Sequence, residues 1–294
     1  MNRHTRRGNY KKSKTFIIFT LMTALDMGAQ NNSVSWHRNS ESIPHGSMHH
    51  HIYTTAVAIN LPSEQEDFYV YTPPGYDPKS PTKYPVLYLL HGDLQDASAW
   101  SKNGGANLVL DELIARGKAR PMIVVMPHGY GNYKFFLGGK KMWGFPILID
   151  QNVNLFSKML LTEIIPRIES DYKVSTKRKD HAIAGLSLGG REAITIGLEN
   201  PSKFSWIGGF SAAFPAALPR FERERIADID PETADLRLLW ISCGISDPYV
   251  PAGNKRLIAQ LKKDNLPVTA VFTPGAHDWP VWRYNFKQFV SQLF

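Results

Sequence analysis

The chain has 294 residues, of which 43% are hydrophobic and 20% are charged, so it is long enough and apolar enough to bury one large core. Its lone cysteine, Cys243, excludes an intrachain disulfide and any metal site built from several cysteines. The formal charge is +8, but residues 1–29 hold six Lys or Arg and one Asp, which carry +5 and leave +3 for residues 30–294. No basic run follows residue 29, so nucleic acid is not an expected partner.

Residues 1–29 have the pattern of a secretory signal peptide. A basic stretch precedes a short apolar run, Thr15–Leu25, and small residues follow near Ala29. The apolar run is well short of the roughly 20 residues that a membrane-spanning helix needs. We therefore expect a secreted or periplasmic bacterial protein that has no stable membrane insertion after leader removal, with an uncleaved anchor as the alternative.

The rest of the chain alternates between strand and helix patterns. Apolar or alternating runs predict eight strands, at 52–59, 67–76, 84–90, 122–126, 181–185, 204–211, 236–244 and 268–274. Helical spacing of apolar residues predicts helices at 107–118, 153–172 (with a kink at Pro166), 188–200, 254–264 and 282–293. The stretch 127–152 is interpreted as a long irregular loop rich in glycine and aromatic residues, typical of a functional rim.

This order of elements indicates an α/β fold. Short continuous apolar runs suit strands that are buried on both faces of a parallel sheet, and the helices between them suit the two covering layers. We expect one domain over residues 30–294, with a mostly parallel sheet of eight strands and helices on both faces.

A glycine-flanked serine lies where a predicted strand turns into a helix. Gly185–Gly189 reads "GLSLG", a Gly-x-Ser-x-Gly motif that places a serine hydroxyl at the sheet edge on a sharp turn. The helix that follows points its first N–H groups toward the same place, where they stabilise negative charge. Ser187 is therefore the candidate nucleophile.

A serine nucleophile needs a base and an acid, and this architecture places them downstream in the order acid, then histidine. His277 is the only histidine after Ser187, just beyond the last predicted strand. Asp247 follows a buried strand at the carboxyl end, where such sheets build their sites. Asp264 lies within a predicted helix and Asp278 adjoins the histidine, so both are less well placed.

The oxyanion of an acyl-transfer reaction needs two backbone N–H donors. We expect one at Leu188, directly after the serine, and the other at Asp93, in the loop after the strand at 84–90.

Two further features are ambiguous. The "HHH" of residues 49–51 suggests a metal site, but neighbouring histidines on a strand face opposite ways and we expect no acidic partner nearby, so no metal is expected. Trp279 and Trp282 are candidate substrate-binding residues for a sugar or an aromatic acyl group, and core packing is the alternative for both.

Taken together, the motifs resemble the esterase D-like branch of the α/β-hydrolases. This branch includes carbohydrate esterase family 1, with its feruloyl and acetyl-xylan esterases, the antigen 85 mycolyltransferases and the S-formylglutathione hydrolases. The matching stretches across about residues 45–294 are "VYTPPGYD", "YPVLYLLHG", "VVMPHG", "LLTEIIPRIESDYKV", "AGLSLGG", "SCGISD" and "HDWPVWR". In addition, "PHGSMHHHIY" is similar to the start of exported polysaccharide esterases of gut and rumen bacteria.

The resemblance implies an α/β-hydrolase fold, with Ser187, Asp247 and His277 as the triad and Asp93 and Leu188 as oxyanion donors. Members of the family often carry Met where Leu188 stands, which a backbone donor tolerates. It further implies a serine carboxylesterase without a cofactor, whose partner is acylated plant polysaccharide or oligosaccharide such as feruloylated or acetylated xylan.

Three alternatives remain open. An antigen 85-type acyltransferase uses the same residues, an S-formylglutathione hydrolase acts inside the cell, and a non-catalytic carbohydrate-binding module uses only the scaffold.

Overall fold

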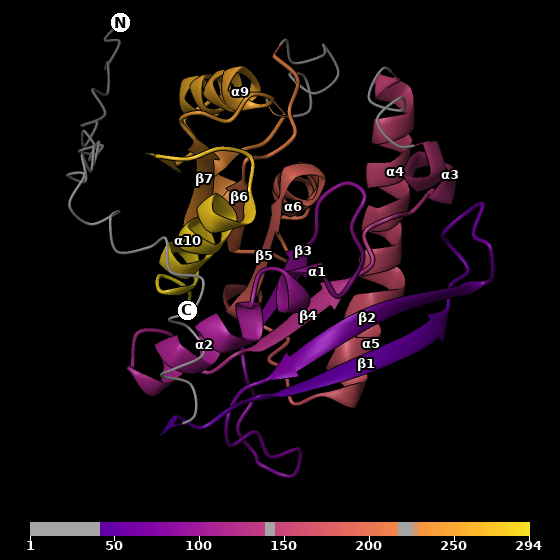
Figure 1. Cartoon of the computed structure of the whole chain (residues 1–294), viewed down its shortest axis with the longest axis vertical. Coiled ribbons are helices and arrows are strands. Elements are labelled where there is room, and N and C mark those ends of the chain that lie inside the picture. The colour runs from indigo at the N-terminus through magenta and orange to yellow at the C-terminus, as the bar shows by residue number, and fades with distance from the viewer. Residues whose placement is uncertain (1–41, 139–144, 217–225, 227) are drawn as a thin grey trace, which may run out of the picture. The chain divides into compact units, whose positions relative to one another are not determined.

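The computed structural model describes residues 42–138, 145–216, 226 and 228–294 (Figure 1). The predicted signal peptide, residues 1–29, lies outside the described residues. All the described elements belong to one compact unit, residues 39–294. In the part of the chain described, no helix is both long enough and apolar enough to span a membrane.

An eight-stranded sheet with the strand order β1-β2-β4-β3-β5-β6-β7-β8 forms the centre of the fold. From β4 to β8 all neighbouring strands are parallel, whereas β1 pairs with β2, and β2 with β4, in the antiparallel sense. The strands are β1 Ser47–Thr54, β2 Gln65–Thr72, β3 Val86–Leu90, β4 Ile123–Pro127, β5 His181–Leu186, β6 Trp206–Phe210, β7 Leu238–Gly244 and β8 Val268–Thr273. The predicted fold class is confirmed.

Helices cover both faces of the sheet (Figure 1). One face packs against α4 Pro146–Met159, α5 Ile165–Asp171, α6 Ser187–Glu199 and α9 Pro251–Lys263, and the other against α1 Ala99–Lys102, α2 Ala106–Ala115 and α10 Trp279–Val290. Short elements complete the described chain: α3 Tyr133–Gly138, η3 Leu160–Ile164, η4 Arg178–Asp180 and α8 Pro231–Ala234.

Strand β3 shows how the two faces arise from sequence. Successive side chains of a strand point to opposite faces. Val86, Tyr88 and Leu90 accordingly join the core cluster under α6, while Leu87 and Leu89 join the cluster under α10. All five residues are fully buried, which explains why this strand reads as an unbroken apolar run.

The structure differs from three expectations. The first strand, β1, spans Ser47–Thr54 and shares only its last three residues with the strand predicted at 52–59. The stretch 127–152 is not a continuous irregular loop, because it contains α3 and the first half of α4, which starts at Pro146. Just before Pro166, where a kink is predicted, the helix makes a π-helical turn, η3, in which Ile165 N donates to Leu160 O. Proline has no N–H to donate to the carbonyl four residues earlier, and the wider turn accommodates that loss.

Candidate active site

Ser187 occupies the sharp turn between β5 and α6. Its φ angle is 50°, in the left-handed region that non-glycine residues rarely adopt. The glycines beside it allow the turn to pack closely: a Cβ on Gly189 would lie 2.2 Å from His91 O, and one on Gly185 would lie 2.3 Å from Gly189 O. The motif therefore consists of glycines because side chains there would collide with backbone.

The structure brings Ser187, His277 and Asp247 together from the carboxyl ends of β5, β8 and β7. Ser187 Oγ lies 3.0 Å from His277 Nε2, and His277 Nδ1 lies 2.7 Å from Asp247 Oδ2. Because an ionised carboxylate only accepts hydrogen bonds, Nδ1–H is the donor to Asp247, and Nε2 is left to accept from the serine hydroxyl. This geometry can move a proton from serine to histidine.

The carboxylate of Asp247 is buried and well supplied with donors. Its second oxygen, Oδ1, accepts from Tyr249 N at 2.9 Å and from Val250 N at 3.2 Å. Burial by itself raises the pKa of this carboxyl, but the hydrogen bonds that it accepts outweigh burial and hold the pKa of Asp247 below its ordinary value. The thiol of Cys243 is also buried, with Sγ 3.9 Å from Asp247 Oδ2.

The His277 ring lies between two aromatic side chains. Trp282, 6% exposed, packs edge-on with its centroid 5.0 Å away, and Tyr249, 73% exposed, packs edge-on at 5.4 Å. Trp279 is half-buried and packs against Trp282 at 5.3 Å and Trp100 at 5.4 Å. Both predicted tryptophans thus belong to the α10 packing layer behind the histidine, and their substrate-binding role stays a prediction.

The Asp278 side chain has its own hydrogen bond at the start of α10. It caps α10 by accepting from Val281 N at 3.2 Å.

The loop after β3 passes directly beside Ser187. A Cβ on Gly92, the residue before Asp93, would lie 2.5 Å from Leu186 Cδ1 and 3.3 Å from Ser187 Cβ. Leu188 is the second residue of α6, and the first four N–H groups of a helix have no partner within it. The placement suits two backbone donors, although the oxyanion role of Asp93 and Leu188 remains a prediction.

A polar network behind this loop was not foreseen from sequence. His91 Nε2 accepts from Gly129 N at 3.0 Å, so its Nδ1–H donates to Gly92 O at 2.8 Å. Burial, followed by the charge of His128, lowers the pKa of His91 to about 3, so its ring is neutral. The ring therefore ties the loop after β3 to the segment after β4.

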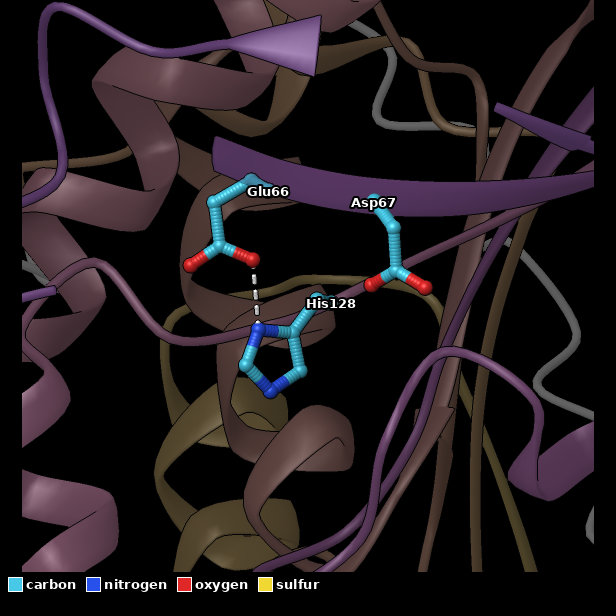
Figure 2. Close-up of side chains that lie close together, drawn as sticks. All are labelled: Glu66, Asp67 and His128. Carbon is cyan, nitrogen blue, oxygen red and sulfur yellow. Dashed lines mark hydrogen bonds and ion pairs between the residues drawn. The ribbon is translucent and has the colours of Figure 1, made fainter. Parts of the chain in front are cut away.

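His128 is braced in turn by a buried carboxylate. Figure 2 shows Glu66, on β2, and His128, just after β4, pointing toward each other, with Glu66 Oε2 2.6 Å from His128 Nδ1. Asp67 lies close by, and the ligand atoms of the three residues are all within 4.8 Å of one another, the spacing of a possible cation site. Glu66 and His128 already bond to each other, and Asp67 Oδ2 bonds to His50 Nε2 at 2.7 Å, so we assign no metal here.

That last contact corrects one premise about the histidine run. His50 does have an acidic partner, contributed by the neighbouring strand β2, while His51 Nε2 lies 2.6 Å from Tyr172 OH.

Comparison with known proteins places the chain in a family. Its sequence matches the Esterase family over residues 60–293. The chain belongs to this esterase family. The resemblance inferred from the motifs is thereby confirmed.

Individual relatives of this esterase carry related names. The chain is 32% identical over 230 residues to an endo-1,4-beta-xylanase/feruloyl esterase of Xylanibacter ruminicola. The matched region covers 76% of this chain but only 29% of that relative. The chain is 25% identical over 228 residues to an acetyl esterase of Caldicellulosiruptor saccharolyticus, covering 67% of this chain and 78% of that protein. The fold matches a CE1 ferulic acid esterase of Anaeromyces mucronatus in complex with ferulic acid, with a TM-score of 0.73, 24% identity and coverage of 86% and 93% of the two chains.

The residues of this esterase that sequence reasoning missed share one property. His128, Tyr130 and Glu66 act through contacts between segments 36 to 62 residues apart. Short sequence motifs do not show which distant segments come into contact. The one available signal was "PHGY", Pro127–Tyr130, directly after a buried strand at the edge where sites are built.

Proposed function

We propose that this chain is a secreted serine carboxylesterase that removes feruloyl or acetyl groups from plant cell-wall polysaccharide such as xylan. The single observation that carries the esterase chemistry is the hydrogen-bonded series Ser187–His277–Asp247 on the turn between β5 and α6. The names of the relatives, a feruloyl esterase and an acetyl esterase, support the choice of acyl group.

In this proposal Ser187 Oγ attacks the ester carbonyl while His277 Nε2 takes the hydroxyl proton. Asp247 keeps the imidazole in the correct tautomer and stabilises the imidazolium that forms. The N–H groups of Asp93 and Leu188 hold the oxyanion of the tetrahedral intermediate.

Collapse of the intermediate expels the sugar alcohol, which receives its proton from His277. Water, deprotonated by the same histidine, then attacks the acyl-serine carbonyl. This second step releases the free acid and restores Ser187.

The test compares hydrolysis of methyl ferulate, acetylated xylan and 4-nitrophenyl acetate by residues 30–294 and by the Ser187→Ala variant. Ferulate release that is lost in Ser187→Ala supports a feruloyl esterase, and acetate release alone supports an acetyl esterase. Retained turnover in the variant overturns the assignment of Ser187.

The same assay separates the remaining alternatives. Adding glycerol diverts the acyl group from free acid to ester in an acyltransferase and leaves acid as the main product in a hydrolase. Binding of xylan without turnover of any ester would instead indicate a carbohydrate-binding module.

Export rests on the pattern of residues 1–29 alone. Expression of the full chain in a bacterial host, followed by mass measurement of the protein recovered outside the cytoplasm, tests it. A product that begins near residue 30 supports cleavage, and a full-length product retained in the cytoplasm contradicts it.

A further inference from the structure

Tyr130 connects to two consecutive residues of the loop after β3. Its hydroxyl donates to Asp93 Oδ1 at 3.1 Å and accepts from Leu94 N at 2.7 Å. Leu94 has a φ angle of 61°, a left-handed conformation that is unfavourable for a non-glycine residue and persists only where the surroundings enforce it. The phenol thus holds both the Asp93 side chain and the N–H of the peptide that joins Asp93 to Leu94.

We propose that Tyr130 is a positioning residue for the oxyanion hole. Its hydroxyl fixes the Asp93 side chain and the Leu94 amide, both attached through the Asp93 Cα, and so restrains the Asp93 N–H, which is bonded to the other side of that Cα. The inference rests on the proposed function, because it gives that N–H its task of stabilising the oxyanion. Such a donor is effective only if it is aimed before the reaction begins.

The Tyr130 ring is itself held in place. It is fully buried, with ring centroids 5.5 Å from His91 and 5.1 Å from His128. His128 is braced by Glu66 (Figure 2), and His91 holds the adjoining carbonyl of Gly92. The loop is therefore fastened to the segment after β4 at two points: the ring of His91 and the hydroxyl of Tyr130.

The experiment measures Tyr130→Phe, which removes only the hydroxyl. With 4-nitrophenyl acetate as substrate we expect kcat and kcat/KM to fall together by about 10-fold, less than the loss of an entire oxyanion donor. Binding of phenylboronic acid, which forms a tetrahedral adduct with the serine, should weaken by a similar factor. Binding of the product ferulate, which is planar at the carboxyl carbon, should change by less than about 2-fold.

Tyr88→Phe is the matched control. The Tyr88 side chain is also fully buried and lies on β3 before the loop, and its hydroxyl has no hydrogen-bond partner among the residues that the structure describes. Its removal should leave kcat and boronic acid affinity within about 2-fold of the parent values, as expected for the loss of an unpaired group.

A second variant covers the case in which Tyr130→Phe folds poorly. Asp93→Ala removes the other partner of the same hydrogen bond and should reproduce the joint loss of kcat and boronic acid affinity. The double variant should lose little more than Tyr130→Phe alone, because Tyr130→Phe already removes the hydrogen bond to Asp93 together with the one from Leu94 N.

Two results would overturn the inference. One is an unchanged boronic acid affinity in both Tyr130→Phe and Asp93→Ala. The other is equal weakening of boronic acid and ferulate binding, which indicates general loosening of the site. If Ser187→Ala is inactive in the same assays, either result removes the role of Tyr130 and leaves the proposed function intact.

Discussion

Ser187 adopts a backbone conformation that suits its position and costs stability. With φ at 50°, the residue projects its hydroxyl from the turn, whereas glycine would adopt the same backbone without strain. Ser187→Gly and Ser187→Ala should both be inactive. Ser187→Gly should be the more stable of the two by about 1 kcal/mol, measured as the free energy of unfolding in urea. Equal stabilities would mean that the turn stores no strain at this residue.

Asp247 should link both activity and stability to pH. Asp247→Asn removes the charge that orients His277, and we expect kcat to fall by about 10³–10⁴-fold. In the folded protein the pKa of Asp247 is lowered, so its ionised form stabilises the native state above the unfolded pKa of about 3.9. This stabilisation is lost as the pH falls through the lower, folded pKa.

The measurement is the difference in free energy of unfolding between the parent chain and Asp247→Asn. The difference should be full at pH 7, shrink below about pH 4, where Asp247 of the unfolded chain becomes protonated, and vanish once the pH has fallen below the lower pKa of the folded protein. A difference that is independent of pH would contradict the depressed pKa.

At the scale of elements, the contact between β3 and the start of α6 is decisive. Helix propensity favours Ala over Gly by about 1 kcal/mol, so propensity alone predicts that Gly189→Ala stabilises the protein. The contact predicts the opposite, because the added Cβ would lie 2.2 Å from His91 O and 2.8 Å from Leu90. We expect destabilisation by about 2–3 kcal/mol together with loss of activity.

Gly197→Ala, in the same helix, is the control. Its Cβ would meet the ends of the Ile207 side chain at 2.7 Å, and such side-chain atoms can shift where backbone cannot. Its cost in unfolding free energy should be the smaller of the two.

Helices and strands with one clear hydrophobic pattern were predictable from the sequence. Elements without such a pattern were not. The unbroken apolar runs of β3 and β4 indicate burial on both faces of the sheet, so these strands can be recognised from their own residues alone. The first half of α4 was missed because Phe145 and Ile147 are exposed and give no apolar periodicity. The π-turn before Pro166 depends on how a helix adapts to a missing N–H, which composition does not reveal.

The same division holds for the site. Ser187, Asp247 and His277 could be found because each follows a strand and the order along the chain restricts the choice. The supports of the loop after β3 could not, because the contacts of Tyr130 and Glu66 join segments distant in sequence.

At the scale of the whole molecule, the layer under α10 joins the site to the core. Phe289 is fully buried against Phe210, with centroids 5.7 Å apart, and α10 also carries Trp282 against His277. Phe289→Ala should lower the free energy of unfolding by about 3–5 kcal/mol. Esterase activity and the helical circular dichroism signal should then be lost over the same range of temperature.

The control is Ile147→Ala, on the opposite helical layer. Ile147 is 82% exposed, so its replacement should change the free energy of unfolding by no more than about 0.5 kcal/mol. Activity lost well before the helical signal in Phe289→Ala would show that the site unfolds separately from the core.

Alkylation of Cys243, the sole thiol of the chain, can report on local unfolding of the site. Burial, and then the neighbouring Asp247 carboxylate, raise the pKa of Cys243 to about 12, so the native protein presents almost no thiolate to an alkylating reagent at neutral pH. Labelling of Cys243 therefore requires local unfolding of β7. The labelling rate reports how often this unfolding exposes Asp247, the acid of the proposed triad, to water. One native residue thus measures how long the catalytic arrangement persists between openings, without any added probe.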